Sequence, residues 1–422
     1  MIATSVAPSA EKKPCASGRL RVLIIAYAYS PSKGSEYRHA WELSRELAQH
    51  HNVTLLFGDS DGLMGSFSSY DRFVAANEDP VQAIKVRSSA TEMAIARLML
   101  RMPFSLFFAF LLRRWHHRAF RVAAALHTDR AFDVVHQLGP IGFRNPGYCW
   151  KLDALTYWGP IGGAQYVNLR MVRRKLSLYF FEALLRNIDV WLKRFSPYVR
   201  TAARKFDRVS FATPENQTYF MRYFGRFGEI ISDQGLHPRS GVDPRTVVPD
   251  ARLVVAWGGT LNARKNVDLL IAIAERSPQN VAFRVMGDGP MRNVLERAAK
   301  ANSKITVLGQ LARQEVQEVL GDADAILLTS LSEANTAILF EGLENGCVPI
   351  APKINGFAAC LNDSFAVTYP NDTWEETVAA AVGGIAQLLD PDVLAQKRGH
   401  LASARESLTW RALAIKHMRC YA

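Results

Sequence analysis

Two carboxylates and two cations in the second half of the sequence have the types and the spacing to bind one ligand together. Glu333 and Glu341 are separated by seven residues, and Arg264 is followed directly by Lys265. The local pattern places Glu333 in a loop and Glu341 on the helix that follows. Amides at a helix start and nearby cations suit a pyrophosphate, and carboxylates accept hydrogen bonds from sugar and ribose hydroxyls. This grouping indicates a site for a nucleotide linked to a sugar.

Short turns follow three of the strands that the sequence predicts near these residues. They read Gly259-Thr260, Gly287-Asp288-Gly289-Pro290 and Gly309-Gln310. Each feature alone is ordinary, because such turns are common and helix-end cations and surface carboxylates are usually solvated. Their convergence favours a site, since ligands of open α/β sheets bind beyond the carboxyl ends of the strands.

Strand and helix signals alternate along the chain, which is the pattern of βαβ units and parallel sheets. Strands are expected at residues 21–27, 53–57, 133–137, 154–158 and 208–212, and again at 253–257, 281–286, 305–308, 323–329 and 348–352, where the series closes. The predicted fold class is therefore α/β, with two doubly wound, Rossmann-like domains that face each other across a cleft.

The C-terminal motifs resemble those of the retaining glycosyltransferases of family 4, which have the GT-B fold. The matching residues are Gly259, Leu261 and Lys265, then Gly287-Asp288-Gly289-Pro290, then the run SEANTAILFEGLENGCVPI. The resemblance implies that Glu333 contacts the donor sugar, Glu341 the nucleotide ribose and Lys265 the donor diphosphate. Two positions depart from the family: Thr260 stands where Arg is common, and Glu344 where a small residue is usual. We expect Glu344 to be a surface or packing variation.

The N-terminal half resembles the same family more loosely, in a bacterial polysaccharide-synthesis branch. Gly34 follows the first strand, and His136 follows Asp133-Val134-Val135 where many members carry an active-site histidine. A lone histidine is more often structural, but this position favours a role near the anomeric carbon. The predicted catalytic residues are His136, Lys265 and Glu333. The predicted donor-binding residues are Gly34, Gly259, Thr260, Arg264, Lys265, Gly287, Gly289, Gln310, Glu333, Asn335, Thr336, Ala337 and Glu341.

These assignments divide the chain into a flexible tail at 1–20, an acceptor-binding domain at 21–240 and a donor-binding domain at 241–400. Residues 401–422 are expected to form a helix that packs back toward the N-terminal domain, and residues 237–250 to form the linker. The five cysteines are scattered and no His/Cys cluster occurs. We therefore expect a reducing compartment, no metal and no cofactor.

The basic charge of the chain lies on one side. Residues 1–240 hold 33 Lys and Arg against 19 Asp and Glu, a net of +14, while the remaining residues have a net of −2. The block 93–118 combines an apolar run too short to span a bilayer with flanking arginines, which is typical of an interfacial segment on anionic lipid. The predicted membrane residues are Phe104, Phe107, Phe108, Arg113, Arg114 and Trp115. A second basic, aromatic block covers 170–205, and buried helices with basic edges are the alternative for both.

The sequence thus predicts a retaining hexosyltransferase that uses a nucleotide-diphosphate sugar and a saccharide acceptor, expected to be lipid-linked, in bacterial exopolysaccharide or cell-surface polysaccharide synthesis. It would be cytoplasmic and peripheral on the inner face of the plasma membrane. A catalytically weak, nucleotide-sugar-binding partner subunit is the main alternative, supported by Thr260. A nucleotide-sugar epimerase and a nucleic-acid-binding protein are less favoured. The epimerase does not predict a membrane-facing half, and the basic blocks alternate with apolar runs, so no nucleic acid is expected.

Overall fold

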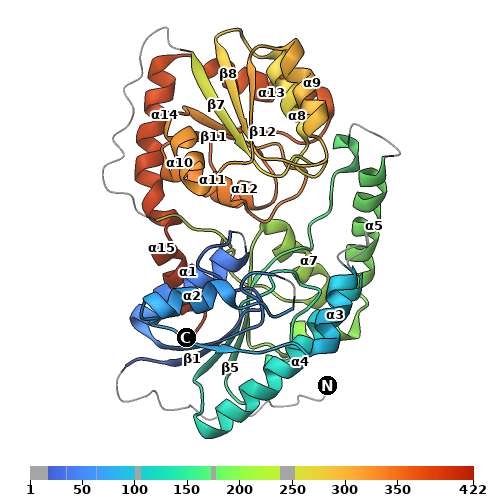
Figure 1. The fold of residues 1–422 in the computed structure, drawn as a ribbon, viewed down its shortest axis with the longest axis vertical. Coiled ribbons are helices and arrows are strands. Elements are labelled where there is room, and N and C mark those ends of the chain that lie inside the picture. The colour runs from blue at the N-terminus through green and yellow to red at the C-terminus, as the bar shows by residue number, and fades with distance from the viewer. Residues whose placement is uncertain (1–17, 35, 63, 100–105, 173–176, 238–251) are drawn as a thin grey trace, which may run out of the picture.

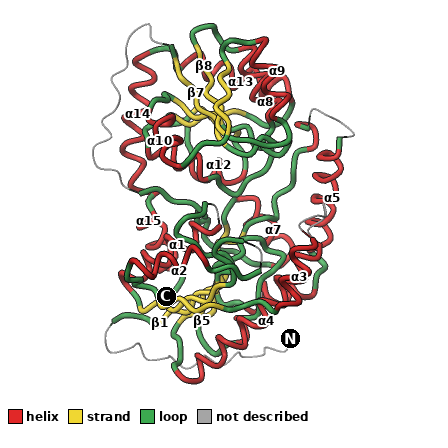
Figure 2. Tube along the Cα trace, viewed as in Figure 1, coloured by secondary structure: helices red, strands yellow, loops and turns green. Residues whose placement is uncertain are grey.

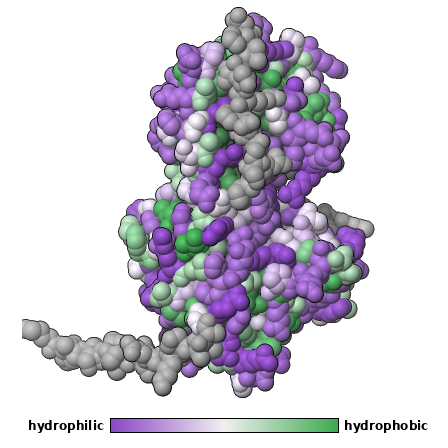
Figure 3. Space-filling model, turned by 90° about the vertical axis from the view of Figure 1, so that its left-hand side faces the viewer, coloured by the Kyte–Doolittle hydropathy of each residue, from purple (hydrophilic) through white to green (hydrophobic). Residues whose placement is uncertain are grey.

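The computed structural model describes residues 18–34, 36–62, 64–99, 106–172, 177–237 and 252–422. Its strands form two six-stranded parallel sheets, one in each half of the chain. Figures 1 and 2 show the sheets in two stacked lobes with helices around them, and Figure 3 shows a narrower waist between the lobes. The predicted fold class, two doubly wound Rossmann-like domains, is confirmed.

The N-terminal sheet has the strand order β3-β2-β1-β4-β5-β6. Its strands are β1 (Arg21–Ile25), β2 (Asn52–Phe57), β3 (Gln82–Lys85), β4 (Val134–Gln137), β5 (Leu155–Ile161) and β6 (Arg208–Phe211). The helices of this half are α1 (Glu36–His50), α2 (Ser68–Ala76), α3 (Ala90–Met99), α4 (Leu106–Asp129), α5 (Leu178–Lys193), α6 (Pro197–Lys205) and α7 (Pro214–Phe224).

The C-terminal sheet has the order β12-β11-β10-β7-β8-β9. Its strands are β7 (Leu253–Gly258), β8 (Val281–Met286), β9 (Ile305–Gly309), β10 (Ala325–Leu327), β11 (Val348–Pro352) and β12 (Val367–Tyr369). Its helices are α8 (Val267–Arg276), α9 (Arg292–Ala301), α10 (Arg313–Gly321), α11 (Ala337–Glu344), α12 (Asn355–Cys360), α13 (Trp374–Gln387) and α14 (Pro391–Ala404). The prediction that residues 348–352 close the series is wrong, because the short edge strand β12 pairs with β11.

Helices cover both faces of each sheet, so strand residues are buried on both sides. In β1, Val22 and Ile24 belong to one apolar cluster, and Leu23 and Ile25 belong to another. This explains why the strands read as continuous apolar runs rather than as alternating patterns.

Two segments pack across the domain boundary: one from the end of the chain packs on the N-terminal domain, and one from the N-terminal half packs on the C-terminal domain. The last helix, α15 (Trp410–Arg419), lies against α1, and Trp410 and Tyr421 are part of the N-terminal core. Conversely, Met171 and Ala183, the latter in α5, belong to the main C-terminal core. Helix α5 runs along one side of both lobes (Figure 1). The two domains are therefore tied together on both sides of the cleft.

Within the described residues no single helix is long and apolar enough to cross a membrane, and one pair, Trp374–Gln387 with Pro391–Leu408, reaches that length only together and is bent by 97°.

Candidate active site

The turns after β7, β8 and β9 interlock at the carboxyl edge of the C-terminal sheet. Gly287 has φ 127°, and a Cβ there would come within 1.9 Å of the carbonyl oxygen of Gly259. Gly289 has φ 155°, and its Cβ would meet the backbone nitrogen of Leu261 at 2.9 Å. Side chains at these positions would push the turns apart, so the glycines predicted from the sequence allow the strand ends to form one compact platform.

Lys265, Arg264 and Glu333 meet on this platform. The Lys265 Nζ lies 2.7 Å from the Glu333 Oε1, and the Arg264 guanidinium donates to the same oxygen. Lys265 also approaches the Thr336 Oγ1 at 3.3 Å and is 8% exposed. No partner of the Glu333 Oε2 occurs in the described part of the chain. One carboxylate thus orients two cations, and its second oxygen can accept a hydroxyl.

The local sequence explains why Lys265 points inward. Asn262 accepts a hydrogen bond from the Lys265 backbone at 2.9 Å, and Asn266 adopts a left-handed conformation, with φ 53°, directly before α8. The carbonyl of Arg264 accepts from the Leu331 backbone at 2.9 Å, which ties this turn to the loop before α11. The cations are therefore fixed by backbone contacts from two loops.

The N-terminus of α11 borders the cation cluster. Thr336 is its N-cap and Ala337 its first residue. Backbone amides of a first helical turn have no acceptor within the helix and attract anions. These amides lie beside Lys265 and Arg264, and the binding of a diphosphate at this place stays a prediction.

Glu341 lies one turn further along α11 and faces the N-terminal domain. Its carboxylate is 3.6 Å from the guanidinium of Arg38 in α1. Arg38 is also 3.4 Å from Glu344, whose Oε1 accepts the His237 backbone amide at 2.9 Å. Of the two expectations for Glu344, a surface position is wrong, because the residue is 5% exposed and is part of an ion-pair cluster between the domains.

The side chain of Asn335 forms hydrogen bonds with the segment that contains Ser232 and Asp233, on the N-terminal side of the molecule. Its side-chain amide donates to the Ser232 Oγ and the Asp233 Oδ1, each at 3.0 Å. The Asp233 carbonyl in turn contacts the His39 Nδ1 at 2.5 Å. Asn335 therefore holds the domains together, and its amide donors are not available to a donor molecule in this arrangement.

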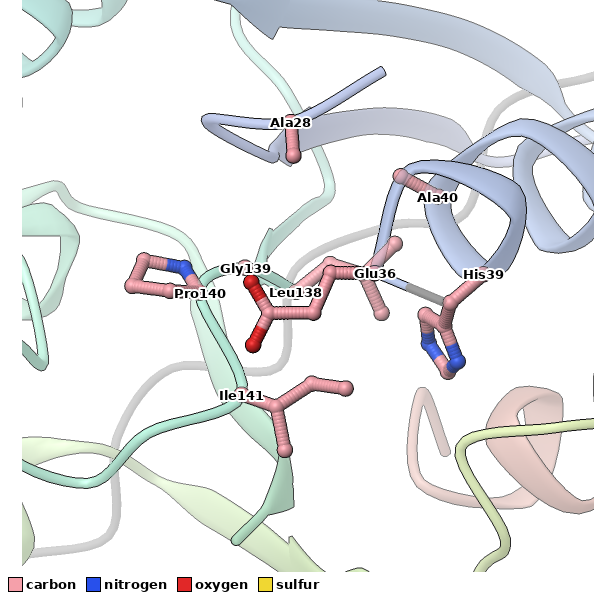
Figure 4. Close-up of a pocket in the computed structure, with 8 residues that line it drawn as sticks. All are labelled: Ala28, Glu36, His39, Ala40, Leu138, Gly139, Pro140 and Ile141. Carbon is pink, nitrogen blue, oxygen red and sulfur yellow. The ribbon is translucent and has the colours of Figure 1, made fainter. Parts of the chain in front are cut away.

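A pocket on the N-terminal side adjoins this contact. It is lined by Ala28, Glu36, His39, Ala40, Leu138, Gly139, Pro140 and Ile141. Figure 4 shows the Glu36 carboxylate directed between Pro140 and Ile141. Burial, and secondarily the charge of Asp233, raises the pKa of Glu36 to about 7. Burial likewise raises the pKa of Asp233 to about 6. This carboxyl pair was missed in the sequence because its members are nearly 200 residues apart.

The remaining predicted donor residues lie at the rim. Gly34, Thr260 and Gln310 are exposed. A Cβ at Gly34 would meet nothing within 4 Å, so the protein itself does not require glycine there. Their donor-binding roles stay predictions.

Arg186 is a further cation near the site that sequence reasoning did not single out. Tyr179, Ala183, Arg186 and Val190 lie on one face of α5 by their spacing. Ala183 packs on the C-terminal core and Val190 on an N-terminal cluster, so Arg186 faces the space between the domains. Burial lowers the pKa of Arg186, and the nearby charges of Arg144 and Arg264 lower it further. Among the described residues its guanidinium has no hydrogen-bond or ion-pair partner, which favours an incoming anion.

The structure contradicts the catalytic role predicted for His136. The side chain is fully buried in β4, with Nδ1 2.9 Å from the Tyr421 hydroxyl and Nε2 2.8 Å from the Gly159 carbonyl. Burial lowers the pKa of His136 to about 3. Both nitrogens are occupied inside the core, and no substrate can reach them.

The predicted membrane residues of block 93–118 also need correction. Trp115 is fully buried and donates to the Val86 carbonyl at 2.9 Å, and Phe108 packs against Tyr27 at 6.1 Å between ring centroids. Arg114 pairs with the buried Glu92 at 2.8 Å, and Arg113 donates to the Tyr148 hydroxyl at 2.9 Å. Phe104 lies outside the described residues, as does the side chain of Phe107. The described residues of this block are mainly structural.

No group of His, Cys, Asp or Glu side chains that could hold a metal ion occurs within the described parts of the chain.

The chain therefore has the GT-B fold, with Lys265, Arg264 and Glu333 gathered beside the first turn of α11 at the strand ends of its C-terminal domain. Residues 243–399 match the family described as "Glycosyl transferases group 1". Together, the match and the fold support a glycosyltransferase.

Solved structures of other proteins share the fold. Sucrose-phosphate synthase from Thermosynechococcus elongatus has a TM-score of 0.63 at 14% identity, covering 96% of this chain and 98% of its own. HepE of Anabaena, solved in complex with UDP and glucose, has a TM-score of 0.56 at 11% identity, covering 95% and 99%. The GPI3 subunit of phosphatidylinositol N-acetylglucosaminyltransferase from Saccharomyces cerevisiae (strain YJM789) is 23% identical over 270 residues. That match covers 61% of this chain and 58% of the relative, so the chain spans less than two thirds of the relative's length.

Proposed function

We propose that this protein is a retaining glycosyltransferase of family 4 that moves a hexose from a nucleotide-diphosphate sugar to a saccharide acceptor. The observation that carries the proposal is the cluster of Lys265, Arg264 and Glu333 beside the first turn of α11. The cations and amides would stabilise the departing diphosphate, and Glu333 would accept a donor-sugar hydroxyl. Glu341 would accept from the ribose.

The acceptor and the location are inferred from chemistry rather than from contacts. We propose a lipid-linked acceptor, used in bacterial exopolysaccharide or cell-surface polysaccharide synthesis on the inner face of the plasma membrane. The net charge of +14 on residues 1–240 supports an anionic partner for this half. The yeast relative, which is named for transfer to phosphatidylinositol, supports a lipid acceptor.

Nucleotide binding provides the first test. UDP, the nucleotide in the HepE complex, should raise the thermal stability of the purified protein by mass action, and UDP-sugars should do so as well. Lys265→Ala should abolish most of this shift and reduce transfer by about 100-fold or more.

Lys304→Ala is the matched control, because Lys304 is also a buried lysine of the C-terminal domain and its Nζ donates to the Glu275 carbonyl at 3.2 Å, outside the site. It should cost stability without changing UDP affinity. Equal effects of both substitutions on UDP binding would contradict the proposal. The anomeric configuration of the product, read by NMR, tests retention.

A catalytically weak partner subunit remains the second candidate, because the yeast and human relatives are both named as subunits. In that case UDP would bind, but no donor sugar would be transferred or hydrolysed.

A further inference from the structure

Helix α5 presents a continuous apolar stripe to solvent. Its members recur at alternating spacings of three and four residues, and they are between 44% and 71% exposed: Leu178, Phe181, Leu185, Ile188, Leu192 and Phe195. This spacing keeps side chains on one face of a helix. Trp191, 44% exposed, lies beside the stripe. The helix is about 24 Å long at 1.5 Å per residue, so the stripe is extended.

The stripe is not needed to hold α5 in place. The opposite face carries Ala183, which belongs to the C-terminal core, and Val190, which belongs to an N-terminal cluster. Soluble proteins rarely expose contiguous apolar patches of this size unless the patch binds something. The exposed face is therefore a candidate docking surface on a helix that is already anchored from behind.

The charges around the stripe favour an anionic surface. Between residues 178 and 205, leaving out Arg186 because it lies on the opposite face of α5, the sequence has five Lys and Arg against two Asp and Glu. The Arg194 guanidinium lies 4.1 Å from the ring centroid of Trp191 and 4.5 Å from that of Phe195. An aromatic group beneath a cation suits the boundary between acyl chains and anionic headgroups.

A second copy of the chain fits the same surface less well. Helix pairs with this spacing are usually matched by charged pairs along their flanks. The carboxylate of Asp189 is already engaged by Arg144 and by Lys193 of its own chain. Pairing two copies would bring the basic excess of both helices together, with Glu182 the only other acid between residues 178 and 205.

We propose that α5 lies in the headgroup region of an anionic lipid bilayer, with the stripe of Leu178, Phe181, Leu185, Ile188, Leu192 and Phe195 inserted among the acyl chains. This rests on the membrane association in the proposed function and deepens it by moving the contact from α4 to α5. Phe110 of α4, 58% exposed, lies one turn before Arg113, which stacks on Tyr198 of α6 at 4.3 Å, and would flank the same surface.

Vesicle binding by the full chain tests the proposal. The protein should sediment with vesicles of phosphatidylcholine and phosphatidylglycerol and bind vesicles of phosphatidylcholine alone less well. A triple variant, Leu185→Ser, Ile188→Ser and Leu192→Ser, should lose at least about tenfold in vesicle affinity. The matched control replaces two exposed apolar residues elsewhere, Met221→Ser and Phe227→Ser, which are 54% and 72% exposed. The control should bind vesicles like the unmodified protein.

Trp191 gives a direct readout in the otherwise unmodified chain. Brominated lipids should quench part of the tryptophan fluorescence, and Trp191→Phe should remove that part. Unchanged vesicle affinity of the triple variant, or quenching that survives Trp191→Phe undiminished, would overturn the proposal. A dimer that becomes a monomer in the triple variant, with no vesicle binding by either protein, would assign the stripe to a second copy instead.

UDP binding is measured in the same samples and should be equal in all of them. If UDP fails to bind even the unmodified protein, the proposed function is contradicted. The membrane proposal is then still tested independently, by the vesicle affinities of the unmodified protein and the variants.

Discussion

The guanidinium of Arg38 lies 3.6 Å from the carboxylate of Glu341, and this contact joins α1 of the N-terminal domain to α11 of the donor platform. The residue proposed to bind the ribose is thus positioned by the opposite domain. Glu42 and Glu344, at 3.7 Å and 3.4 Å, complete a shell of three carboxylates around one buried cation.

Arg38→Ala should therefore lower both stability and nucleotide affinity. Removing the cation leaves three neighbouring carboxylates, two of them with little exposure, which should cost roughly 2–4 kcal/mol in the free energy of unfolding. UDP affinity should fall about fivefold through misplacement of Glu341. Arg45→Ala is the control, since Arg45 is on the same helix but pairs with Asp79 within its own domain at 2.9 Å. Urea unfolding and calorimetry measure the two effects, and an Arg45 variant with the same loss of UDP affinity would contradict the assignment.

Arg186→Ala should weaken UDP binding without destabilising the protein. Its guanidinium has no partner among the described residues and faces Arg264 across the cleft, so its removal relieves repulsion when no anion is bound. We expect about a three- to tenfold loss of affinity and a weaker dependence of binding on salt. Arg194→Ala, on the same helix but stacked on Trp191, should leave UDP affinity unchanged. Unaltered UDP binding in the Arg186 variant would exclude this residue from the site.

The Glu36 and Asp233 pair should make stability fall as pH rises from about 4 toward 7. A carboxyl whose pKa is raised in the folded state binds its proton more tightly there than in the unfolded chain, so folding is favoured below the folded pKa. With the pKa of Asp233 at about 6 and that of Glu36 at about 7 in the folded protein, and both near 4 in the unfolded chain, the loss should occur between about pH 4 and pH 7. Glu36→Gln should flatten the profile by about 1–3 kcal/mol, as measured by urea unfolding across that range. A profile that keeps its slope in this variant would place the titration elsewhere.

His136→Ala should behave as a core substitution. It removes contacts to the Tyr421 hydroxyl and the Gly159 carbonyl and leaves a cavity, which should cost about 2–4 kcal/mol. At a temperature where the variant stays folded, UDP affinity and transfer should remain within about twofold of the unmodified protein. A folded variant with normal stability and greatly reduced transfer would restore the catalytic role that the sequence suggested.

The sequence predicted the fold well because the signals that define it are local. All ten expected strands are present, since buried parallel strands read as apolar runs. The platform of turns was also predictable, because Gly259, Gly287 and Gly289 sit at strand ends, while its role in donor binding stays a prediction. Strands β3 and β12 were both missed, because four and three residues at a sheet edge give too short a pattern.

The failures involve partners far away in the chain. His136 stands at the end of an apolar strand, and only Tyr421, 285 residues later, shows that its ring is enclosed. Glu344 meets Arg38 across 306 residues. For α4, the composition identified basic and aromatic residues, but it could not tell which face of the helix is turned inward, and Trp115 lies on that face.

The position of Tyr421 in the core of the first domain also affects how the protein is made. Strand β1 emerges from the ribosome some 400 residues before the side chain that covers His136 beside it. During synthesis the core of the N-terminal sheet therefore stays incomplete until the C-terminal residues have been made. The second domain, whose strands lie together in the chain, can fold before the first domain is complete. We expect the order of folding on the ribosome to run against the order of translation, and the nascent first domain to be the stage most exposed to chaperones.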